Sequence, residues 1–120
     1  MAPRPAPQPA SAPVALAHPR AEVAGRIQER IEKGKRLYNA SQRSYEETVE
    51  FKRNVSKWTD YNTELLERMF TNNSISKEYK FSGGGAIGGT SEFYHVLLGE
   101  RTAKLESILG RLELYPEPAA

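Results

Sequence analysis

The sequence predicts an all-α fold, a small antiparallel helical bundle or helical hairpin whose long helices carry coiled-coil-like seams. Two segments repeat apolar residues at steps of three and four or of seven, which is heptad spacing. No segment shows the sustained two-residue alternation that is typical of a half-buried strand. The chain has 120 residues, enough for one small domain. We therefore expect a helical domain over residues 20–115.

The first nineteen residues are expected to form a disordered tail that is rich in Pro and Ala. The segment 1–20 holds six of the eight prolines and has no aromatic residue and no apolar periodicity. Such a segment buries too little apolar surface to offset the entropy of ordering it. No stretch resembles a secretory signal or approaches the roughly 18 apolar residues of a membrane span. We expect a cytoplasmic protein, with a second short tail at 116–120.

The first helix is expected at about residues 20–38. Gly25 and Gly34 lie within it, and each costs about 1 kcal/mol relative to alanine. This helix therefore needs tertiary contacts in order to form. The apolar residues that repeat every four positions along it are Val23, Ile27 and Ile31.

The second helix is expected at about residues 45–70. Ser44 and Glu47 have the S-x-x-E spacing of a capping box, in which each side chain accepts a hydrogen bond from the other residue's backbone N–H. Asn62 is polar but stands in the apolar series. Either it fixes register and partner number, or the seam ends before it and it meets water. The seam of this helix consists of Phe51, Val55, Trp58, Asn62, Leu65 and Met69.

The third long helix is expected at about residues 91–114, after one short helical turn and a glycine-rich loop at 82–90. Thr90 or Ser91 can cap its start. A helix with one apolar stripe must cover that stripe with a partner surface. We expect the two long helices to be antiparallel, with the first helix across or beside them, and to support protein–protein association, most simply self-association. The seam of this last helix consists of Leu98, Leu105 and Leu112.

The glycine-rich loop matches the pattern G-x-G-x-x-G at Gly83, Gly85 and Gly88. In a dinucleotide site this pattern follows a strand and opens a helix, whereas here a helical turn precedes it and the lysine of a P-loop is missing. Free N–H groups at the helix start near Thr90 could still hold a phosphate. We favour a flexible hinge, and the alternative is a small-ligand or nucleotide sensor that uses this loop.

No catalytic or metal site is predicted. The chain has no cysteine, and His18 and His95 are separated in sequence without further ligands. The Ser, Asp and His residues show no spacing typical of a nucleophilic triad. Trp58, Tyr61 and Phe70 are more typical of core and partner contact than of a ligand pocket, because no convergent polar groups accompany them. We expect no enzymatic activity and no cofactor.

Charge is distributed unevenly along the chain, although the net charge is only +2. Residues 1–43 carry eight Lys and Arg against three Glu, and residues 44–120 carry nine against twelve acidic residues. A basic segment of this kind can bind nucleic acid, but here it does not alternate with aromatic residues that stack on bases. We interpret it as the solvated face of the first helix, and nucleic-acid binding is the less favoured alternative.

Four motifs occur in a fixed order: GKRLYN, then W-x3-N-x2-L-L-x3-F from Trp58 to Phe70, then SISKEYKFSG, and after the glycines LESILGRLELYPE. Over about residues 27–117 the chain resembles the helical region that precedes the TIR-like nucleotide-binding domain of bacterial anti-phage effectors. In that family an α/β domain follows, which binds or cleaves a nucleotide such as NAD. The sequence has no position that matches the family's catalytic residues. The resemblance therefore implies a regulatory or oligomerising helical module in antiviral defence, with a TIR-like effector as partner.

Overall fold

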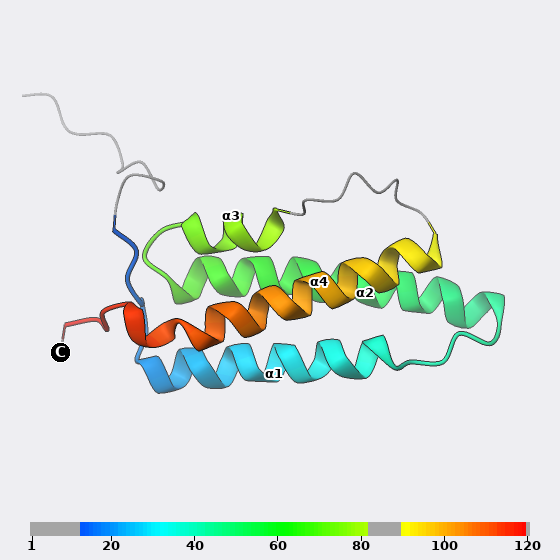
Figure 1. Ribbon diagram of the computed structural model, residues 1–120, viewed down its shortest axis with the longest axis horizontal. Coiled ribbons are helices and arrows are strands. Elements are labelled where there is room, and N and C mark those ends of the chain that lie inside the picture. Colours follow the sequence, from blue (N-terminus) through cyan, green and yellow to red (C-terminus); the bar gives the residue numbers. More distant parts are fainter. Residues whose placement is uncertain (1–12, 82–89, 120) are drawn as a thin grey trace, which may run out of the picture.

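The computed structural model describes residues 13–81 and 90–119, and the described residues form helices joined by short connections. No β-strand occurs in these two ranges, apart from one isolated bridge between Leu16 and Phe70. The all-α bundle expected from the sequence is confirmed (Figure 1). The elements are α1 (Arg20–Tyr38), α2 (Tyr45–Met69), α3 (Ser74–Lys80), α4 (Ser91–Gly110) and a 3₁₀ turn, η1 (Leu112–Leu114).

The helices α2 and α4 run in the same direction, and α1 runs antiparallel to both (Figure 1). Ring contacts agree with this arrangement. Phe51 near the start of α2 and His95 near the start of α4 have centroids 6.1 Å apart, while Phe70 and Tyr115, just beyond the ends of these helices, are 5.5 Å apart. The expectation that the two long helices are antiparallel is wrong, because α3 runs back along α2 before α4 begins.

The start of α2 follows from its capping residues. The Ser44 hydroxyl accepts a hydrogen bond from the backbone N–H of Glu47 at 3.1 Å, as expected for an N-cap. The Glu47 carboxylate differs from the expected capping box, because it accepts the backbone N–H of Arg43 at 2.6 Å. The second half of the box therefore closes one residue before the N-cap.

The helix α4 begins as expected and ends early. Thr90 caps it, because its hydroxyl accepts the backbone N–H of Phe93 at 3.0 Å. The helix ends at Gly110, four residues before the expected boundary, and the chain continues as the 3₁₀ turn η1. Glycine is a weak helix former, so a change of backbone geometry at this point costs little.

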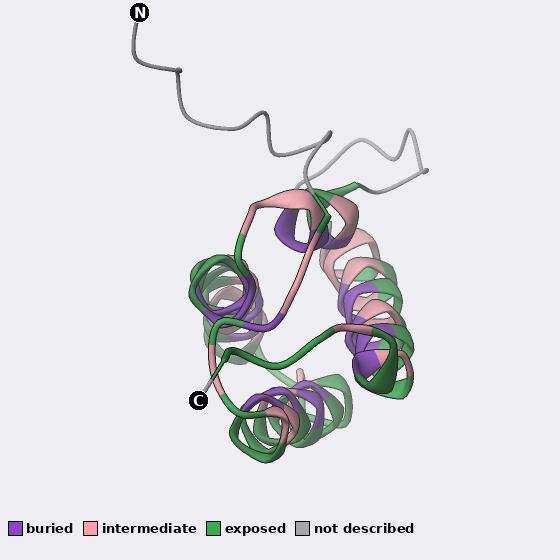
Figure 2. Ribbon diagram, turned by 90° about the vertical axis from the view of Figure 1, so that its left-hand side faces the viewer, coloured by how far each residue is buried: buried purple, intermediate pink, exposed green. Residues whose placement is uncertain are grey.

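The core runs along the axis of the bundle, where the buried faces of the helices meet (Figure 2).

The close packing of α1 depends on a glycine, which has no side chain. A Cβ added to Gly34 would lie 2.6 Å from Cζ2 of Trp58 and 2.7 Å from Oγ1 of Thr102. The same atom on Gly25 would meet nothing within 4 Å. Gly34 therefore lets α1 approach α2 and α4 closely, and the indole fills the space of the absent side chain.

Residues 13–19 pack against the bundle as an extended strap. Leu16 is 1% exposed and belongs to the core. Its backbone N–H donates to the carbonyl oxygen of Pro116 at 2.9 Å, and the N–H of Ala17 donates to that of Met69 at 2.8 Å. The expectation of a disordered tail does not hold for this segment, because its backbone partners come from distant parts of the sequence.

The chain beyond η1 is held by α1 rather than forming a free tail. The Arg20 side chain donates from Nε to the carbonyl oxygen of Leu112 at 3.2 Å and from Nη2 to that of Tyr115 at 2.6 Å. Its backbone N–H donates to the Glu117 carboxylate at 2.6 Å. The two ends of the described chain are therefore bound to each other at one end of the bundle.

Candidate functional site

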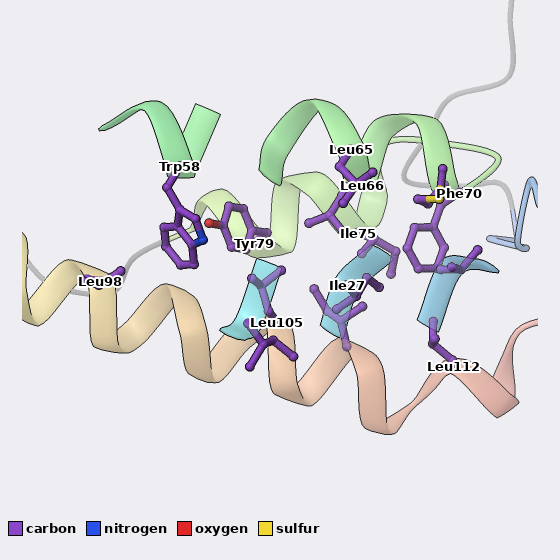
Figure 3. Close-up of a cluster of buried hydrophobic side chains, with 14 of the residues drawn as sticks. Ile27, Trp58, Leu65, Leu66, Phe70, Ile75, Tyr79, Leu98, Leu105 and Leu112 are labelled. Atoms are coloured by element: carbon purple, nitrogen blue, oxygen red, sulfur yellow. The ribbon is translucent and has the colours of Figure 1, made fainter. Parts of the chain in front are cut away.

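All nine residues of the two expected seams are buried within this one chain. In Figure 3 the labelled seam side chains lie among those of Ile27, Ile75 and Tyr79 from α1 and α3. Because the chain covers its own seams, these residues stabilise the bundle and are not available as a contact surface of the folded protein. The buried seam residues are Phe51, Val55, Trp58, Asn62, Leu65, Met69, Leu98, Leu105 and Leu112.

Asn62 is fully buried and links three helices. Its Oδ1 accepts a hydrogen bond from Nε of Arg30 at 2.7 Å, and its Nδ2 donates to the hydroxyl of Tyr79 at 2.8 Å. The alternative in which Asn62 meets water is therefore wrong. A buried polar group that is satisfied in one arrangement fixes the register of the helices around it. Here the helices are α1, α2 and α3 of the same chain.

The Tyr79 side chain completes this buried network. Burial raises the pKa of its phenol above the ordinary value, although the hydrogen bond from Asn62 and the positive charge of Arg101 act in the opposite direction. Cζ of Arg101 lies 5.1 Å from the centroid of the Tyr79 ring. The phenol is therefore held neutral, with its hydroxyl oxygen accepting from Asn62 and its ring facing a cation.

Basic residues of α4 and its end hold the short helix α3 in place. Arg101 donates from Nη2 to the carbonyl oxygen of Lys80 at 3.0 Å, and Lys104 donates from Nζ to that of Glu78 at 3.0 Å. Arg111 binds the Glu78 carboxylate through two hydrogen bonds of 2.9 Å. Cations are favourable at a helix C-terminus, where carbonyl groups lack intrahelical partners. The sequence analysis did not single out these residues.

The outer surface has a groove of about 290 Å³ between α1 and α2. Leu65 and Met69 of the α2 seam line it, but they are only 7% and 5% exposed and belong to the core. Its walls carry aromatic and charged groups from both helices and from the strap, namely His18, Glu22, Arg26, Tyr61, Glu64 and Arg68.

Charges on the two walls of this groove do not pair across it. Arg26 of α1 and both Glu64 and Arg68 of α2 form no ion pair with any residue in the described ranges. Glu22 lies 3.8 Å from Nδ1 of His18, on its own side of the groove. The groove therefore stays open, and its unpaired groups are available to a partner.

Tyr61 lines the groove and is 49% exposed, unlike Trp58 and Phe70, which are buried in the core. The guanidinium carbon of Arg30 lies 4.2 Å from the centroid of the Tyr61 ring. This stacking restrains an aromatic side chain that solvent still reaches. Tyr and Arg are enriched among the residues that dominate binding energy at protein interfaces.

The first helix carries a sequence pattern that corresponds to one wall of the groove. Polar and charged residues recur every four positions along the start of the first helix, which places them in one row on its surface. The row consists of His18, Glu22, Arg26 and Arg30.

The glycines of the expected anion-binding loop, Gly83, Gly85 and Gly88, lie outside the described residues. Neither the hinge nor the sensor interpretation is therefore tested. Thr90 is described, and its hydroxyl oxygen accepts the N–H of Phe93 as the cap of α4.

The described part of the chain contains no group of three His, Cys, Asp or Glu side chains that could hold a metal ion. His18 and His95 lie at opposite ends of α1. His95 donates from Nε2 to the carbonyl oxygen of Tyr38 at 2.9 Å and stacks on its ring, with centroids 3.9 Å apart. Within residues 13–81 and 90–119, no helix combines the length and the apolar character needed to cross a membrane.

No protein-family model, no curated protein and no solved structure matches the chain.

Proposed function

We propose that the chain is a non-catalytic helical module for protein–protein association, and that it associates with a second copy of itself. The observation that supports this proposal is the groove between α1 and α2. It combines the exposed ring of Tyr61 with the guanidinium groups of Arg26 and Arg68, which form no ion pair with a described residue. Aromatic residues, Met and Arg are enriched at protein interfaces relative to the rest of the surface.

The charged groups of the groove suit recognition better than catalysis. A catalytic site brings a nucleophile or an acid–base pair into contact, and a third group orients it. Glu64 and Arg68 of α2 instead lie opposite Glu22 and Arg26 of α1 without a hydrogen bond across the groove. Such groups can complement the charges of a partner and fix its orientation.

The regulatory part of the proposal rests on the sequence motifs. The resemblance to the region before a TIR-like domain assigns this module to the control or assembly of a TIR-like effector in antiviral defence. A neighbouring gene segment that encodes a TIR-like domain would support this assignment, and a neighbourhood without any effector gene would count against it.

Self-association is tested by light scattering after size-exclusion chromatography, with the full chain loaded from low micromolar to hundreds of micromolar. The monomer has a mass of 13.4 kDa. We expect the measured mass to rise with concentration toward twice this value. A constant mass of one chain over the whole range would contradict the proposal.

A further inference from the structure

We infer that two copies of this chain exchange their straps, residues 13–19, so that the strap of each copy binds to the bundle of the other. The binding site of the strap is the slot between residues 69–71, at the end of α2, and Pro116 beyond η1. This inference rests on the proposed self-association and names the segment that joins the two copies.

The slot binds an extended segment through backbone groups on both of its sides. On one side, the N–H of Thr71 donates to the carbonyl oxygen of Ala15 at 2.9 Å, and the N–H of Ala15 donates to Oγ1 of Thr71 at 2.9 Å. On the other side, the N–H of Leu16 donates to the carbonyl oxygen of Pro116. Main-chain hydrogen bonds of this kind supply affinity for an added extended segment. The strap of a second copy carries the same groups, so the slot fits it equally well.

A single side chain anchors the strap in the core. Leu16 is 1% exposed, whereas no other residue of the strap is buried. Leu16 forms the isolated bridge with Phe70, which is itself buried. An empty slot would expose this apolar surface to water, which is unfavourable. The slot is therefore filled in both states, by the chain's own strap in the monomer and by the strap of the second copy in the dimer.

The connection between the strap and α1 is short and contains a proline. It consists of Ala17, His18 and Pro19, and none of the three is buried. The chain bends at Ala17 and His18. A proline favours extended backbone at the residue before it, and an extended connection directs the strap away from its own bundle. Exchange of an identical element between copies is a low-cost route to a dimer, because the same contacts form in both states.

Exchange leaves the rest of the bundle unchanged and limits how the two copies are placed. The Arg20 side chain keeps its hydrogen bonds to the carbonyl groups of its own chain, such as that of Tyr115. Four residue steps join Leu16 to Arg20, so the slot of one copy must lie within about 14 Å of the start of α1 in the other. The ends at which α1 begins therefore meet in a closed twofold dimer. The groove between α1 and α2 lies beside this junction, because His18 and Met69 line it.

Introduced cysteines test the exchange directly, because the chain has no cysteine of its own. Ala15 and Thr71 lie opposite each other in the slot, as a cross-strand pair that a disulfide can bridge. An Ala15→Cys chain and an isotopically labelled Thr71→Cys chain are mixed at hundreds of micromolar, oxidised, and analysed by mass spectrometry. We expect a disulfide between the two different chains. Val96→Cys at an exposed position of α4 is the matched control for Ala15→Cys, and it should give at least about tenfold less of the mixed product.

A chain that carries both Ala15→Cys and Thr71→Cys can be locked as a monomer. Oxidation at low micromolar concentration closes the disulfide within one chain and holds the strap on its own bundle. We expect the locked chain to have a dimer dissociation constant at least about tenfold above that of the same protein after reduction. Sedimentation velocity at concentrations up to hundreds of micromolar measures both forms. The reduced form is the control for the two substitutions themselves.

The outcomes separate this inference from the proposed function. A wild-type chain that stays monomeric at every concentration would overturn both. A wild-type dimer that the locked chain forms equally well would overturn the exchange alone and leave self-association standing. The exchange is also wrong if a sample that sedimentation shows to be dimeric gives no disulfide between the two different chains.

Discussion

The two ends of the bundle are built from different numbers of elements. At the end that holds both described termini, α3 joins α1, α2 and α4, and the strap and η1 add Leu16 and Leu112 to the core. At the opposite end the described elements are α1, α2 and α4 alone. The buried apolar side chains there are Phe51, Val55 and Leu98, beside the stacked rings of Tyr38 and His95.

This difference indicates which part of the molecule depends on contacts between distant parts of the sequence. The crowded end joins residues near the start, middle and end of the chain through backbone hydrogen bonds. The three-helix end has fewer buried apolar groups per turn of helix, so it should open locally at a lower free energy. Native-state hydrogen exchange should therefore be faster at residues 48–55 of α2 than at residues 62–69.

Trp58 lies between the two ends, and its removal should have the largest effect. The indole is 1% exposed, packs against Gly34, and donates from Nε1 to the carbonyl oxygen of Arg30 at 2.9 Å. We expect Trp58→Ala to lower the free energy of unfolding by about 3–5 kcal/mol, the usual result of emptying a buried aromatic site. Urea unfolding measures this. A decrease in the free energy of unfolding of less than about 1 kcal/mol would show that Trp58 is not part of the core that joins the two ends.

Leu16 tests whether the strap belongs to the crowded end. We expect Leu16→Ala to lower the free energy of unfolding by about 2–5 kcal/mol, because the side chain is fully buried. The matched control is Val96→Ala at an exposed position of α4, with a change of at most about 0.5 kcal/mol. Hydrogen exchange should accelerate most near Met69 and Phe70. Equal effects of the two variants would place the strap outside the core.

Gly34 and Gly25 form a matched pair within α1. We expect Gly34→Ala to lower the free energy of unfolding by about 1–3 kcal/mol, because the new methyl group overlaps the Trp58 ring and the Thr102 hydroxyl. Gly25→Ala should instead raise it by up to about 1 kcal/mol, because alanine favours the helix and the site is open. Thermal or urea unfolding of both variants decides. Stabilisation by both substitutions would contradict the close approach of α1 to the indole.

Among the destabilising substitutions, Tyr79→Phe should lower the free energy of unfolding least, and its effect should depend on pH. Tyr79→Phe leaves Nδ2 of Asn62 without its partner, and we expect a loss of about 1–2 kcal/mol near neutral pH. Burial raises the pKa of Tyr79 in the folded protein. Its contribution is therefore complete below the unfolded value of about 10 and is lost as pH rises from there toward the folded pKa.

The comparison of the wild type with Tyr79→Phe isolates Tyr79, because every other side chain is the same in the two proteins. The stability difference between the wild type and Tyr79→Phe should shrink above about pH 10. A difference that stays constant or grows over that range would contradict a neutral, buried phenol.

The sequence predicted the elements whose causes are local. The bounds of α1 agree with expectation, and α2 ends only one residue before its expected boundary. These bounds were predictable because apolar periodicity and the Ser44 cap act over a few residues. All nine residues that the sequence assigned to the seams are buried, including the polar Asn62. Periodicity indicates that a stripe must be covered, but it does not say by which surface. The cover proved to be the rest of the same chain.

Features that depend on distant contacts were missed. The strap around Leu16 has no periodic pattern, and its order comes from backbone groups near Met69 and Pro116. The parallel arrangement of α2 and α4 depends on the direction of the short helix α3. The groove between α1 and α2 depends on the distance between two helices, which the sequence pattern of either helix does not contain.

The position of the strap sets an order for folding during synthesis. Leu16 is synthesised long before its backbone partner Pro116. The helices α1 and α2 can pair before then, but the site of Leu16 lacks one wall until η1 and Pro116 have emerged. Contacts between residues this far apart in the sequence form slowly, because the long loop between them must close first. A chain stalled before Pro116 would leave Leu16, Met69 and Phe70 exposed, which gives chaperones and proteases a direct way to recognise an unfinished copy.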